Sequence, residues 1–420
     1  MRILVVSGEY PPMKGGVGRY TYHLVSALKK SNKKNIDVYI VTNSHKEKAN
    51  TDISSSMSGD NTTIIHDNTD NSNHDNKGIY HGITKKGDIK NSDRLLALIQ
   101  QLKPDIVNIQ YERGLYEIDT TIGYMFRRIL YGSTLDRFYK ECPVPTVSTL
   151  HTLFPYHEYK GYINERALIK EGRLASLPSP LRAAIRKRVM NQRYGLLQEV
   201  VRLSSDIISP AKTIHKIVKR GAVIYHGAEP AQSLSATNKH EFRKEFELPD
   251  DKRLLLAFGY VGSYKGFDIL DNLRLPKDWC LVIKQNKHER GVEQPIQIKN
   301  AINLSLGHID DVTLSKLFFA CDAMIFPYKL VSVSGVLFDA LAHGLPFVAS
   351  NLEFFREFEE MQLGLTCNRN AKSFSDAITN LAEGYNKYKE NVQRFNPKLR
   401  WSNVANDHIE FYSKLLKSAS

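Results

Sequence analysis

The sequence predicts an α/β protein of two parallel-sheet domains that face each other across a cleft. At 420 residues the chain is longer than one ordinary hydrophobic core. Short apolar runs, typical of buried strands, alternate with segments whose apolar residues recur at helical spacing. A polar stretch at residues 228–250 interrupts the alternation, which then resumes. Because ligands of parallel sheets bind at the carboxyl ends of the strands, two such units leave a ligand cleft between them.

The first unit begins with a strand, a glycine-rich loop and a helix. The apolar run at residues 2–8 predicts a buried strand, and the glycines of "KGGVGRY" (14–20) follow it closely. Apolar residues then recur at helical spacing as far as Leu28, and two lysines stand where basic charge favours a helix end. A second strand is expected at residues 36–43. This strand–loop–helix–strand order is the start of a parallel sheet.

The same patterns place the remaining elements along both units. Further strands are predicted at residues 104–111, 146–151, 206–210, 222–227, 252–260, 279–285, 323–328 and 346–350. Helices are predicted at residues 94–102, 181–203, 311–321, 335–344 and 401–416. We therefore expect an N-terminal domain at 1–230, a second domain at 231–400, and a C-terminal helix at 401–420 that packs back on the first domain.

Residues 44–78 differ in composition from the rest of the first unit. They consist mainly of Asn, Asp, Ser, Thr and Lys and contain few apolar residues. Such a segment cannot bury enough apolar surface to offset the entropy lost on ordering, so we interpret it as a flexible insertion. Its His, Asp and Asn residues also allow a metal-binding tract, which is the less favoured reading.

Cysteine spacing and hydropathy argue against a secreted or membrane-spanning protein. The four cysteines lie far apart and form no C-x-x-C pair, which argues against a disulfide framework or a zinc site. No apolar run approaches the eighteen residues of a membrane span, and the N-terminal run is too short for a secretory signal. We therefore expect reduced thiols and a cytoplasmic protein.

The chain is basic, with a formal net charge of +13 and a pI of about 9.3. Residues 160–220 alone hold fourteen Lys or Arg and four Asp or Glu. Two interpretations stay open. The region is either a solvated helix surface or a binding surface for an anionic partner, which is the cytoplasmic face of a membrane or an anionic ligand. The basic residues scatter around the helix predicted within this region, which weakens the case for an amphipathic anchor. No zinc-finger spacing or RNA-binding aromatic motif is present, so nucleic acid is not expected.

A phosphate site is predicted at the start of the helix near Gly335. A strand ends just before it, Ser334 is placed to cap the helix, and Gly344 is placed to end it. The free N–H groups of Gly335 and Val336 then point into the cleft at the positive end of the helix dipole. Asp339, one turn further along, carries a carboxylate that can accept hydrogen bonds from sugar hydroxyls.

Here the sequence resembles the retaining GT-B glycosyltransferases of group 1, family 4. "DALAHGLPFVAS" (339–350) is similar to the family pattern E-G-x-G-L-x-x-x-E-A-x-A-x-G-x-P-V-V-A, with Asp339 at the second acidic position. Val331 stands at the first acidic position, and the chain reads "SVSGVL", as some members of the family do. The resemblance implies a GT-B fold of two Rossmann-like domains, an acceptor-side N-terminal domain and a C-terminal donor domain.

Two more segments carry the resemblance and imply site residues. "LLLAFGYVGSYKGFDIL" (254–270) is similar to G-R-x-x-x-x-K-G-x-D, where the lysine, here Lys265, lies against the donor diphosphate. A fixed cation there stabilises the negative charge of the leaving phosphate. Tyr260 occupies the companion arginine position, so one positive charge is missing. The paired glycines at the N-terminus, Gly15 and Gly16, match those with which the family closes over the donor diphosphate.

The resemblance also implies roles for two histidines. His151 follows a strand, as a histidine near the donor sugar does in the family, and we assign it to positioning the sugar or assisting catalysis. A hydrogen-bonded loop histidine is the alternative. His226 matches the family as well but lies at the domain hinge, where a structural role is preferred.

The activity implied is retaining transfer of a hexose from a UDP- or GDP-sugar to a carbohydrate or lipid-linked acceptor. No metal or other cofactor is implied, and no D-x-D motif occurs that would suggest a metal-dependent transferase. Two alternatives stay open. Val331 and Tyr260 allow a nucleotide-sugar-binding protein without catalysis. An NAD-dependent oxidoreductase requires G-x-G-x-x-G, whose third glycine is absent, and its acid, Asp37, would stand before the strand rather than at its end.

Overall fold

The computed structural model describes most of both predicted domains. The described residues are 1–13, 15–31, 35–43, 78–116, 134–161, 180, 198–231, 234–286, 295–307 and 309–419. The predicted flexible insertion, apart from Gly78, lies outside them. So do most of the predicted helix at 181–203 and much of the basic region at 160–220.

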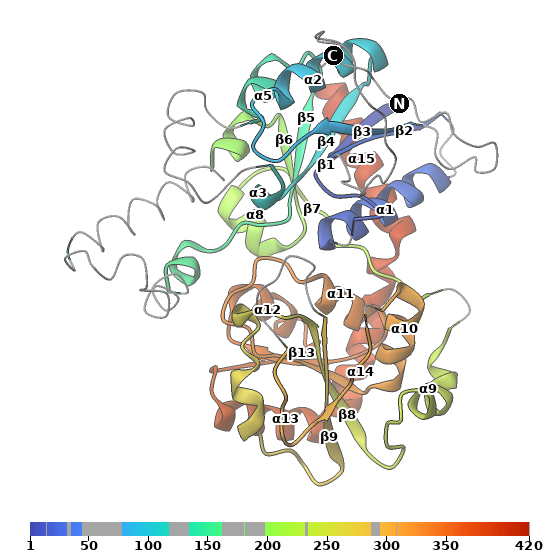
Figure 1. The fold of residues 1–420 in the computed structure, drawn as a ribbon, viewed down its shortest axis with the longest axis vertical. Coiled ribbons are helices and arrows are strands. Elements are labelled where there is room, and N and C mark those ends of the chain that lie inside the picture. Colours follow the sequence, from blue (N-terminus) through green and yellow to red (C-terminus); the bar gives the residue numbers. More distant parts are fainter. Residues whose placement is uncertain are drawn as a thin grey trace, which may run out of the picture.

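Two wholly parallel sheets form the two domains (Figure 1). The first sheet has the strand order β3-β2-β1-β4-β5-β6-β7, and the second has the order β10-β9-β8-β11-β12-β13. In each sheet the order reverses beside the domain's first strand, so the crossovers go in both directions and helices cover both faces. The predicted α/β fold of two parallel-sheet, Rossmann-like domains is confirmed.

The elements follow the alternation expected from the sequence. The strands are β1 (Arg2–Ser7), β2 (Asp37–Asn43), β3 (Ile79–Thr84), β4 (Ile106–Tyr111), β5 (Thr146–Leu150), β6 (Asp206–Ser209), β7 (Ala222–Val223), β8 (Arg253–Tyr260), β9 (Trp279–Asn286), β10 (Ile302–Asn303), β11 (Ala323–Phe326), β12 (Phe347–Ser350) and β13 (Gly364–Cys367). The α-helices are α1 (Gly16–Lys30), α2 (Asn91–Leu102), α3 (Arg113–Tyr116), α5 (Asp136–Glu141), α8 (Lys212–Val218), α9 (Lys239–Glu245), α10 (Asp311–Ala320), α11 (Gly335–Ala342), α12 (Glu353–Glu359), α13 (Ala371–Glu383), α14 (Tyr385–Phe395) and α15 (Trp401–Ala419). Short 3-10 helices are η3 (Ala236–Asn238), η4 (Ser263–Lys265), η5 (Phe267–Asn272) and η6 (Asn396–Leu399).

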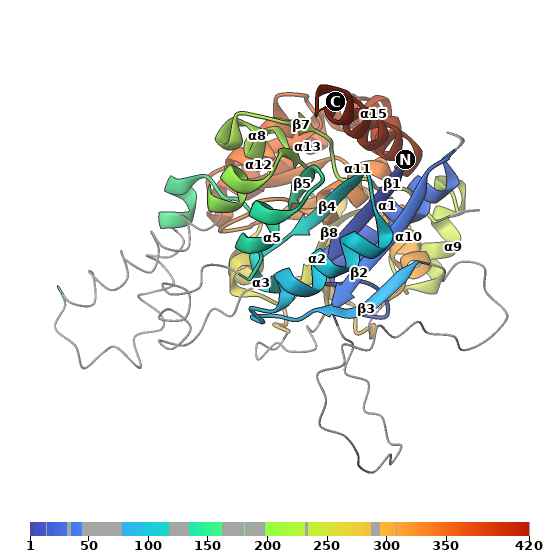
Figure 2. The ribbon, with the colours of Figure 1, turned by 90° about the horizontal axis from the view of Figure 1, so that it is seen from above.

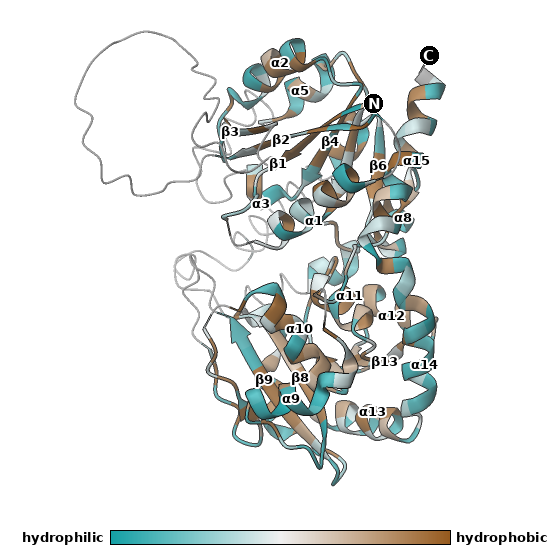
Figure 3. Cartoon of the chain, turned by 90° about the vertical axis from the view of Figure 1, so that its right-hand side faces the viewer, coloured by the Kyte–Doolittle hydropathy of each residue, from teal (hydrophilic) through white to brown (hydrophobic). Residues whose placement is uncertain are grey.

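Both faces of each sheet are buried, as Figure 3 shows for the apolar strands enclosed by helices. In β1, Ile3 and Val5 pack toward α1 and α15, whereas Leu4 and Val6 pack toward α2 and α5. In the second domain, one face of β8 packs on α10, α11 and α12, and the other on α13. This two-sided burial explains why these strands are continuous apolar runs.

The last helix returns to the first domain. The chain crosses from the second domain through η6, and α15 then packs against α1 (Figures 1 and 2). Trp401, Ile409 and Tyr412 are buried in the same apolar cluster as Tyr20 and Leu24 of α1. The C-terminal end of the described chain thus completes the core of the N-terminal domain.

The strand predicted at 222–227 is shorter than expected. Only Ala222 and Val223 pair with β6, and the chain from Ile224 leaves the sheet toward the second domain. A Cβ at Gly227 would lie 2.4 Å from the Trp401 ring, so this segment packs closely on the returning helix. Its apolar residues serve the domain crossing rather than a strand.

Candidate functional site

The glycine loop and the start of α11 lie at the carboxyl ends of their parallel strands, where the two domains meet. This placement also tests the oxidoreductase reading. Asp37 pairs with Arg2 at the first position of β1, whereas the glycine loop follows Ser7 at the last. The two are separated by the length of the strand, about 17 Å. Asp37 therefore stands at the wrong edge of the sheet to hold a ribose beside the loop.

The N-terminus of α11 has the capped form expected from the sequence. The Leu337 N–H donates to the Ser334 hydroxyl at 3.4 Å and to the Ser334 carbonyl at 3.0 Å. The helix starts at Gly335 and runs through eight residues, and Gly344 just beyond it has φ +79°. The N–H groups of Gly335 and Val336 lie in the first turn, where a helix has no intrahelical partners for them. This end can receive an anion.

Lys265 and Ser334 meet through a residue that the sequence did not single out. The Lys265 ammonium donates to the Tyr328 hydroxyl at 2.5 Å and lies 3.9 Å from the centre of its ring. Burial raises the pKa of Tyr328, and the neighbouring Ser334 side chain opposes that rise. Tyr328 closes an apolar strand run, so the sequence pattern indicates a core residue. Its hydroxyl instead joins the two polar groups that we assign to the donor.

The Lys265 ammonium is buried, with 8% of the residue exposed. Burial lowers the pKa of Lys265 to about 7. Among the described residues, no carboxylate lies within ion-pair distance of its nitrogen. A cation that is desolvated and lacks a counterion is stabilised by any anion that reaches it. The geometry is therefore that of an anion site, and a diphosphate at the start of α11 would supply the charge.

Two glycines and an arginine fix the loop around Lys265. A Cβ at Gly259 would lie 3.3 Å from the Lys265 side chain, and one at Gly266 would lie 1.9 Å from the Pro327 carbonyl. The Arg369 guanidinium donates to the carbonyls of Pro327 at 3.0 Å and Gly266 at 3.2 Å. Arg369 also pairs with Asp268. Tyr260, at the position of the family's arginine, ends β8 and brings no charge.

Asp339 does not stand free in the cleft. It is 3% exposed, and its carboxylate accepts hydrogen bonds from the Arg19 guanidinium at 2.7 and 3.3 Å. Arg19 donates in addition to Asp311 at 2.7 Å, and His23 lies 3.0 Å from the other oxygen of Asp311. One arginine of α1 thus bridges two helices of the second domain. Sequence analysis missed Arg19, although it lies within the quoted "KGGVGRY".

Charge on the Arg19 bridge is strongly favoured in the folded protein. Burial opposes the charge, but the carboxylates of Asp339 and Asp311 outweigh it and raise the pKa of Arg19. On the other side, hydrogen bonding to His23 and the charge of Arg19 lower the pKa of Asp311. Arg19 and Asp311 therefore stay charged across the ordinary pH range, and the bridge holds α1 against α10 and α11.

The two predicted donor glycines differ in their surroundings. A Cβ added at Gly15 would fall 1.9 Å from a carboxylate oxygen of Glu9, so Gly15 gives room to a neighbour within the domain. At Gly16, the first residue of α1, an added Cβ would meet no heavy atom of the described residues within 4 Å, its chain neighbours and the backbone of its own helix aside. Only Gly16 therefore faces open space that a ligand can occupy.

His151 and His226 contact the same aromatic residue of α1. Each ring centre lies 4.8 Å from that of Tyr20. His151 Nε2 lies 2.8 Å from the Gln110 side-chain oxygen, and His226 Nδ1 lies 2.7 Å from the Gly227 carbonyl. Burial lowers the pKa of His151 to about 3 and that of His226 to about 4. Both rings are neutral at physiological pH.

The loop before α11 is tied to the N-terminal domain by a second missed residue. The Ser332 hydroxyl accepts from the Leu153 N–H at 2.8 Å and donates to the Leu153 carbonyl at 3.1 Å. Val331 beside it is 6% exposed and packs in the apolar core of the second domain. The position that is acidic in the family pattern thus holds a core residue. Ser332 joins the "SVSGVL" loop to the segment after His151.

No helix in the described ranges is long and apolar enough to cross a membrane.

Comparisons with known proteins agree with this architecture. Residues 268–384 match the model of a family described as glycosyl transferases group 1. An uncharacterized glycosyltransferase of Methanocaldococcus jannaschii is 24% identical over 227 residues, covering 50% of this chain and 57% of that protein. The alignment therefore spans little more than half of the relative's length. The segment that matches the family model lies within the second domain.

Solved structures resemble the chain along its whole length. A sucrose-phosphate synthase from Thermosynechococcus elongatus has 14% identity and a TM-score of 0.59, with 100% of both chains covered. The Anabaena protein HepE, in complex with UDP, has 12% identity and a TM-score of 0.58, covering 99% of this chain and all of that one. At these identities the likeness shows the fold, which is the two-domain GT-B arrangement.

Proposed function

We propose that the protein is a retaining glycosyltransferase that moves a hexose from a nucleotide-diphosphate sugar to an acceptor hydroxyl. One observation carries the proposal: the buried ammonium of Lys265 has no carboxylate within ion-pair distance in the described part of the chain, and Tyr328 links it to Ser334, which caps α11. Two anion-attracting features at one place fit a diphosphate. They lie within or next to the segment that matches the group 1 glycosyl transferases.

The donor diphosphate would lie between Lys265 and α11. The N–H groups of Gly335 and Val336 would donate hydrogen bonds to its oxygens, and the Tyr328 hydroxyl holds the Lys265 ammonium in place. As the bond from the sugar carbon to the phosphate oxygen breaks, its electron pair passes to the phosphate. Lys265 stabilises this growing charge without reorganising, because its position is already fixed.

Retention follows if the acceptor attacks from the face that the phosphate leaves. An oxocarbenium-like sugar forms, the acceptor oxygen bonds to the anomeric carbon, and its proton passes to the departing phosphate. The neutral His151 ring would position the sugar by hydrogen bonding, since a group with a pKa of about 3 is a poor general base at neutral pH. No step in this scheme uses a metal ion.

The N-terminal domain would close over the donor through α1. Gly16 leaves open space for the diphosphate, and Arg19 holds α1 on Asp339 and Asp311. Because Asp339 is engaged by Arg19, it would contribute to donor binding by sharing its carboxylate between the arginine and a sugar hydroxyl. The acceptor would then bind on the N-terminal domain's side of the cleft.

UDP is the first nucleotide to test, because the HepE structure of the same fold contains it. GDP-sugars are the second choice. For the acceptor we propose a carbohydrate or a lipid-linked saccharide, and a cytoplasmic protein that contacts the membrane face through the basic region at 160–220. Sedimentation with anionic lipid vesicles at low and high salt tests this contact, and absence of binding at low salt contradicts it.

A nucleotide-sugar-binding protein without catalysis is the second candidate. Val331, buried in the core where the family pattern has an acid, and the uncharged Tyr260 favour it. Both candidates predict donor binding. Only the transferase predicts turnover.

The decisive experiment screens UDP- and GDP-sugars by thermal shift and then by nucleotide release. The transferase predicts a stabilising donor, release of its nucleotide, and loss of both effects in Lys265→Met. Lys316→Met, which removes a lysine paired with Glu245 away from the site, is the matched control. Stabilisation without release or transfer would select the binding protein. No stabilisation by any donor would contradict both.

A further inference from the structure

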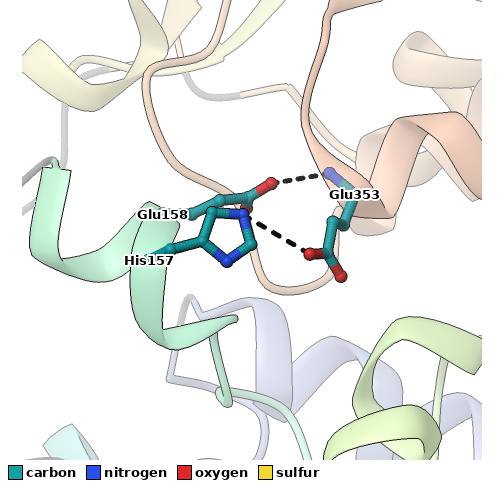
Figure 4. A group of neighbouring side chains, drawn as sticks. All are labelled: His157, Glu158 and Glu353. Carbon is teal, nitrogen blue, oxygen red and sulfur yellow. Dashed lines mark hydrogen bonds and ion pairs between the residues drawn. The ribbon is translucent and has the colours of Figure 1, made fainter.

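Three side chains of the kinds that bind metal ions meet where the two domains touch (Figure 4). His157 and Glu158 lie in the helical turn at 156–161, which follows β5 in the N-terminal domain. Glu353 is the first residue of α12 in the second domain. One nitrogen and two carboxylate oxygens, one atom from each residue, lie within 4.8 Å of one another.

Only one of the two oxygens of the Glu158 carboxylate has a hydrogen-bond partner among the described residues. Its Oε1 accepts a hydrogen bond from the Glu353 N–H at 2.7 Å. Its Oε2 is buried and has no hydrogen-bond partner among the described residues. Figure 4 shows this carboxylate beside the His157 ring, on the side that faces Glu353. A buried carboxylate oxygen without a partner is costly, and a cation is the ligand that would satisfy it.

The charges around the cluster leave room for a cation. His157 Nε2 lies 3.4 Å from Glu353 Oε1, and Arg356 lies 3.9 Å from the same oxygen. These contacts go to Glu353, and none of them supplies a partner for Glu158 Oε2. Apart from the His157 ring, two carboxylates of the cluster face one arginine.

We propose that His157, Glu158 and Glu353 bind a divalent ion of the zinc class and so bridge the two domains. One imidazole and two carboxylates suit zinc, whereas magnesium and calcium prefer oxygen ligands alone. Bonds of 2.0–2.2 Å place tetrahedral ligand atoms about 3.3–3.6 Å apart, so the cluster must contract by about 1 Å. The His157 side chain is 68% exposed and can rotate to do so. Water completes the coordination.

The ion would act on domain arrangement and not on the chemistry of transfer. Glu158 can keep its bond to the Glu353 N–H through Oε1 while Oε2 binds the ion. Because the ligands come from both domains, only the arrangement that brings them together binds the ion well. Binding therefore stabilises that arrangement by mass action. The proposal is independent of the proposed activity, since it concerns neither the donor nor the acceptor.

The test titrates the metal-free, untagged full chain with Zn²⁺ by calorimetry, with Mg²⁺ in a parallel arm. We expect one Zn²⁺ per chain from this site. His157→Ala and Glu353→Gln should each weaken it at least tenfold, because each removes a direct ligand. His240→Ala is the matched control, since His240 is exposed and pairs with a single acid, Asp250, at 2.7 Å. It should leave the affinity unchanged.

Thermal unfolding without metal checks that the variants are folded. If Zn²⁺ affinity is the same in the parent, His157→Ala and Glu353→Gln, the site does not exist as proposed. If His240→Ala weakens binding as much as they do, the ion is held elsewhere. Equal affinity for Mg²⁺ would overturn the assignment to the zinc class. Selective loss in the two ligand variants supports the bridge.

Discussion

The two cations that face the cleft have opposite surroundings. Arg19 of the N-terminal domain is held by two carboxylates, which keep it charged. The Lys265 ammonium of the second domain contacts the Tyr328 hydroxyl and lies near the rings of Tyr328 and Tyr264, and burial lowers its pKa to about 7. Arg19 is already paired with carboxylates and joins the two domains. Lys265 has no carboxylate partner among the described residues, which is the arrangement expected of a group that binds an anionic ligand.

Removing the charge of Lys265, which has no carboxylate partner among the described residues, should have the largest effect on the rate of transfer. In Lys265→Met we expect turnover to fall about 100-fold or more, because loss of one fixed transition-state contact typically costs ~2.7–4 kcal/mol. The measurement is kcat with the best donor from the screen, with Lys316→Met as control. Turnover within threefold of the parent would show that Lys265 is not the diphosphate cation.

Breaking the ion pair between Arg19 and Asp339 should weaken the contact between the domains as well as lower turnover. Asp339→Ala leaves Arg19 with Asp311 alone, and we expect turnover to fall more than tenfold with a lower unfolding temperature. Charge-assisted hydrogen bonds of this kind contribute about 1.5–3 kcal/mol. Asp311→Asn, which weakens the other half of the bridge, separates the two effects. It should lower the unfolding temperature but retain more turnover than Asp339→Ala. Equal turnover in both would contradict a donor role for Asp339.

The glycine loop tests the contrast between Arg19 and Lys265 further. It lies next to Arg19 in the sequence, but we expect it to contact the donor. In Gly16→Val we expect an unchanged unfolding temperature and about tenfold weaker donor binding. Beyond its chain neighbours and its own helix backbone, the added Cβ meets no atom of the described residues within 4 Å, but the side chain fills the space assigned to the diphosphate. Gly15→Val should instead disturb Glu9 and lower the unfolding temperature. Normal donor binding in a folded Gly16→Val protein would reduce the loop to a turn.

The pH dependence of donor binding should come from Lys265 and not from Arg19. The free ammonium has a pKa of about 7, and the diphosphate should raise it, so binding takes up a proton above pH 7. Affinity for a UDP-sugar, whose diphosphate does not titrate here, should then fall about fivefold from pH 7 to 8 as the protonated fraction falls. Calorimetry in buffers of different ionisation enthalpy counts the proton. A flat profile would place the anion away from Lys265.

His151 should have the smallest effect. Its ring is neutral and bonded to Gln110, so His151→Gln removes a hydrogen bond and not a charge. A neutral hydrogen bond contributes about 0.5–1.5 kcal/mol, which corresponds to roughly a 2–10-fold loss of turnover. The pH profile should keep its shape, since His151 does not titrate above about pH 4. Loss of the acidic limb in this variant would instead reveal a catalytic base.

The sequence predicted most of the sheet architecture because its strands are buried on both faces. Strands such as β1 and β8 appear as unbroken apolar runs, and that signal is strong. β3 was missed because His81 and Gly82 interrupt its apolar residues. The strand predicted at 222–227 was too long, since apolar residues at a domain crossing look like those of a strand.

The candidate site was predictable only where it depends on local order along the chain. The Ser334 cap and the start of α11 follow from neighbouring residues. The role of Tyr328 depends on its contact with Lys265, 63 positions away in the same domain. Those of Ser332 and Arg19 depend on contacts between the domains, such as the Arg19–Asp339 pair over 320 positions of sequence. No spacing rule reports such a contact. The assignments of His151, Lys265 and Asp339 to catalysis stay predictions until the variants are measured.

The return of α15 to the first domain has a consequence for synthesis on the ribosome. Trp401 and Tyr412 fill the same cluster as Ile3 and Tyr20, which are made first. At translation rates of about 5–20 residues per second, the N-terminal sheet waits roughly 10–40 s after its last strand for this helix. During that interval α15 does not yet cover its face of α1. The first domain to be made is therefore the last to be completed, and a chaperone that shields this face would act in that window.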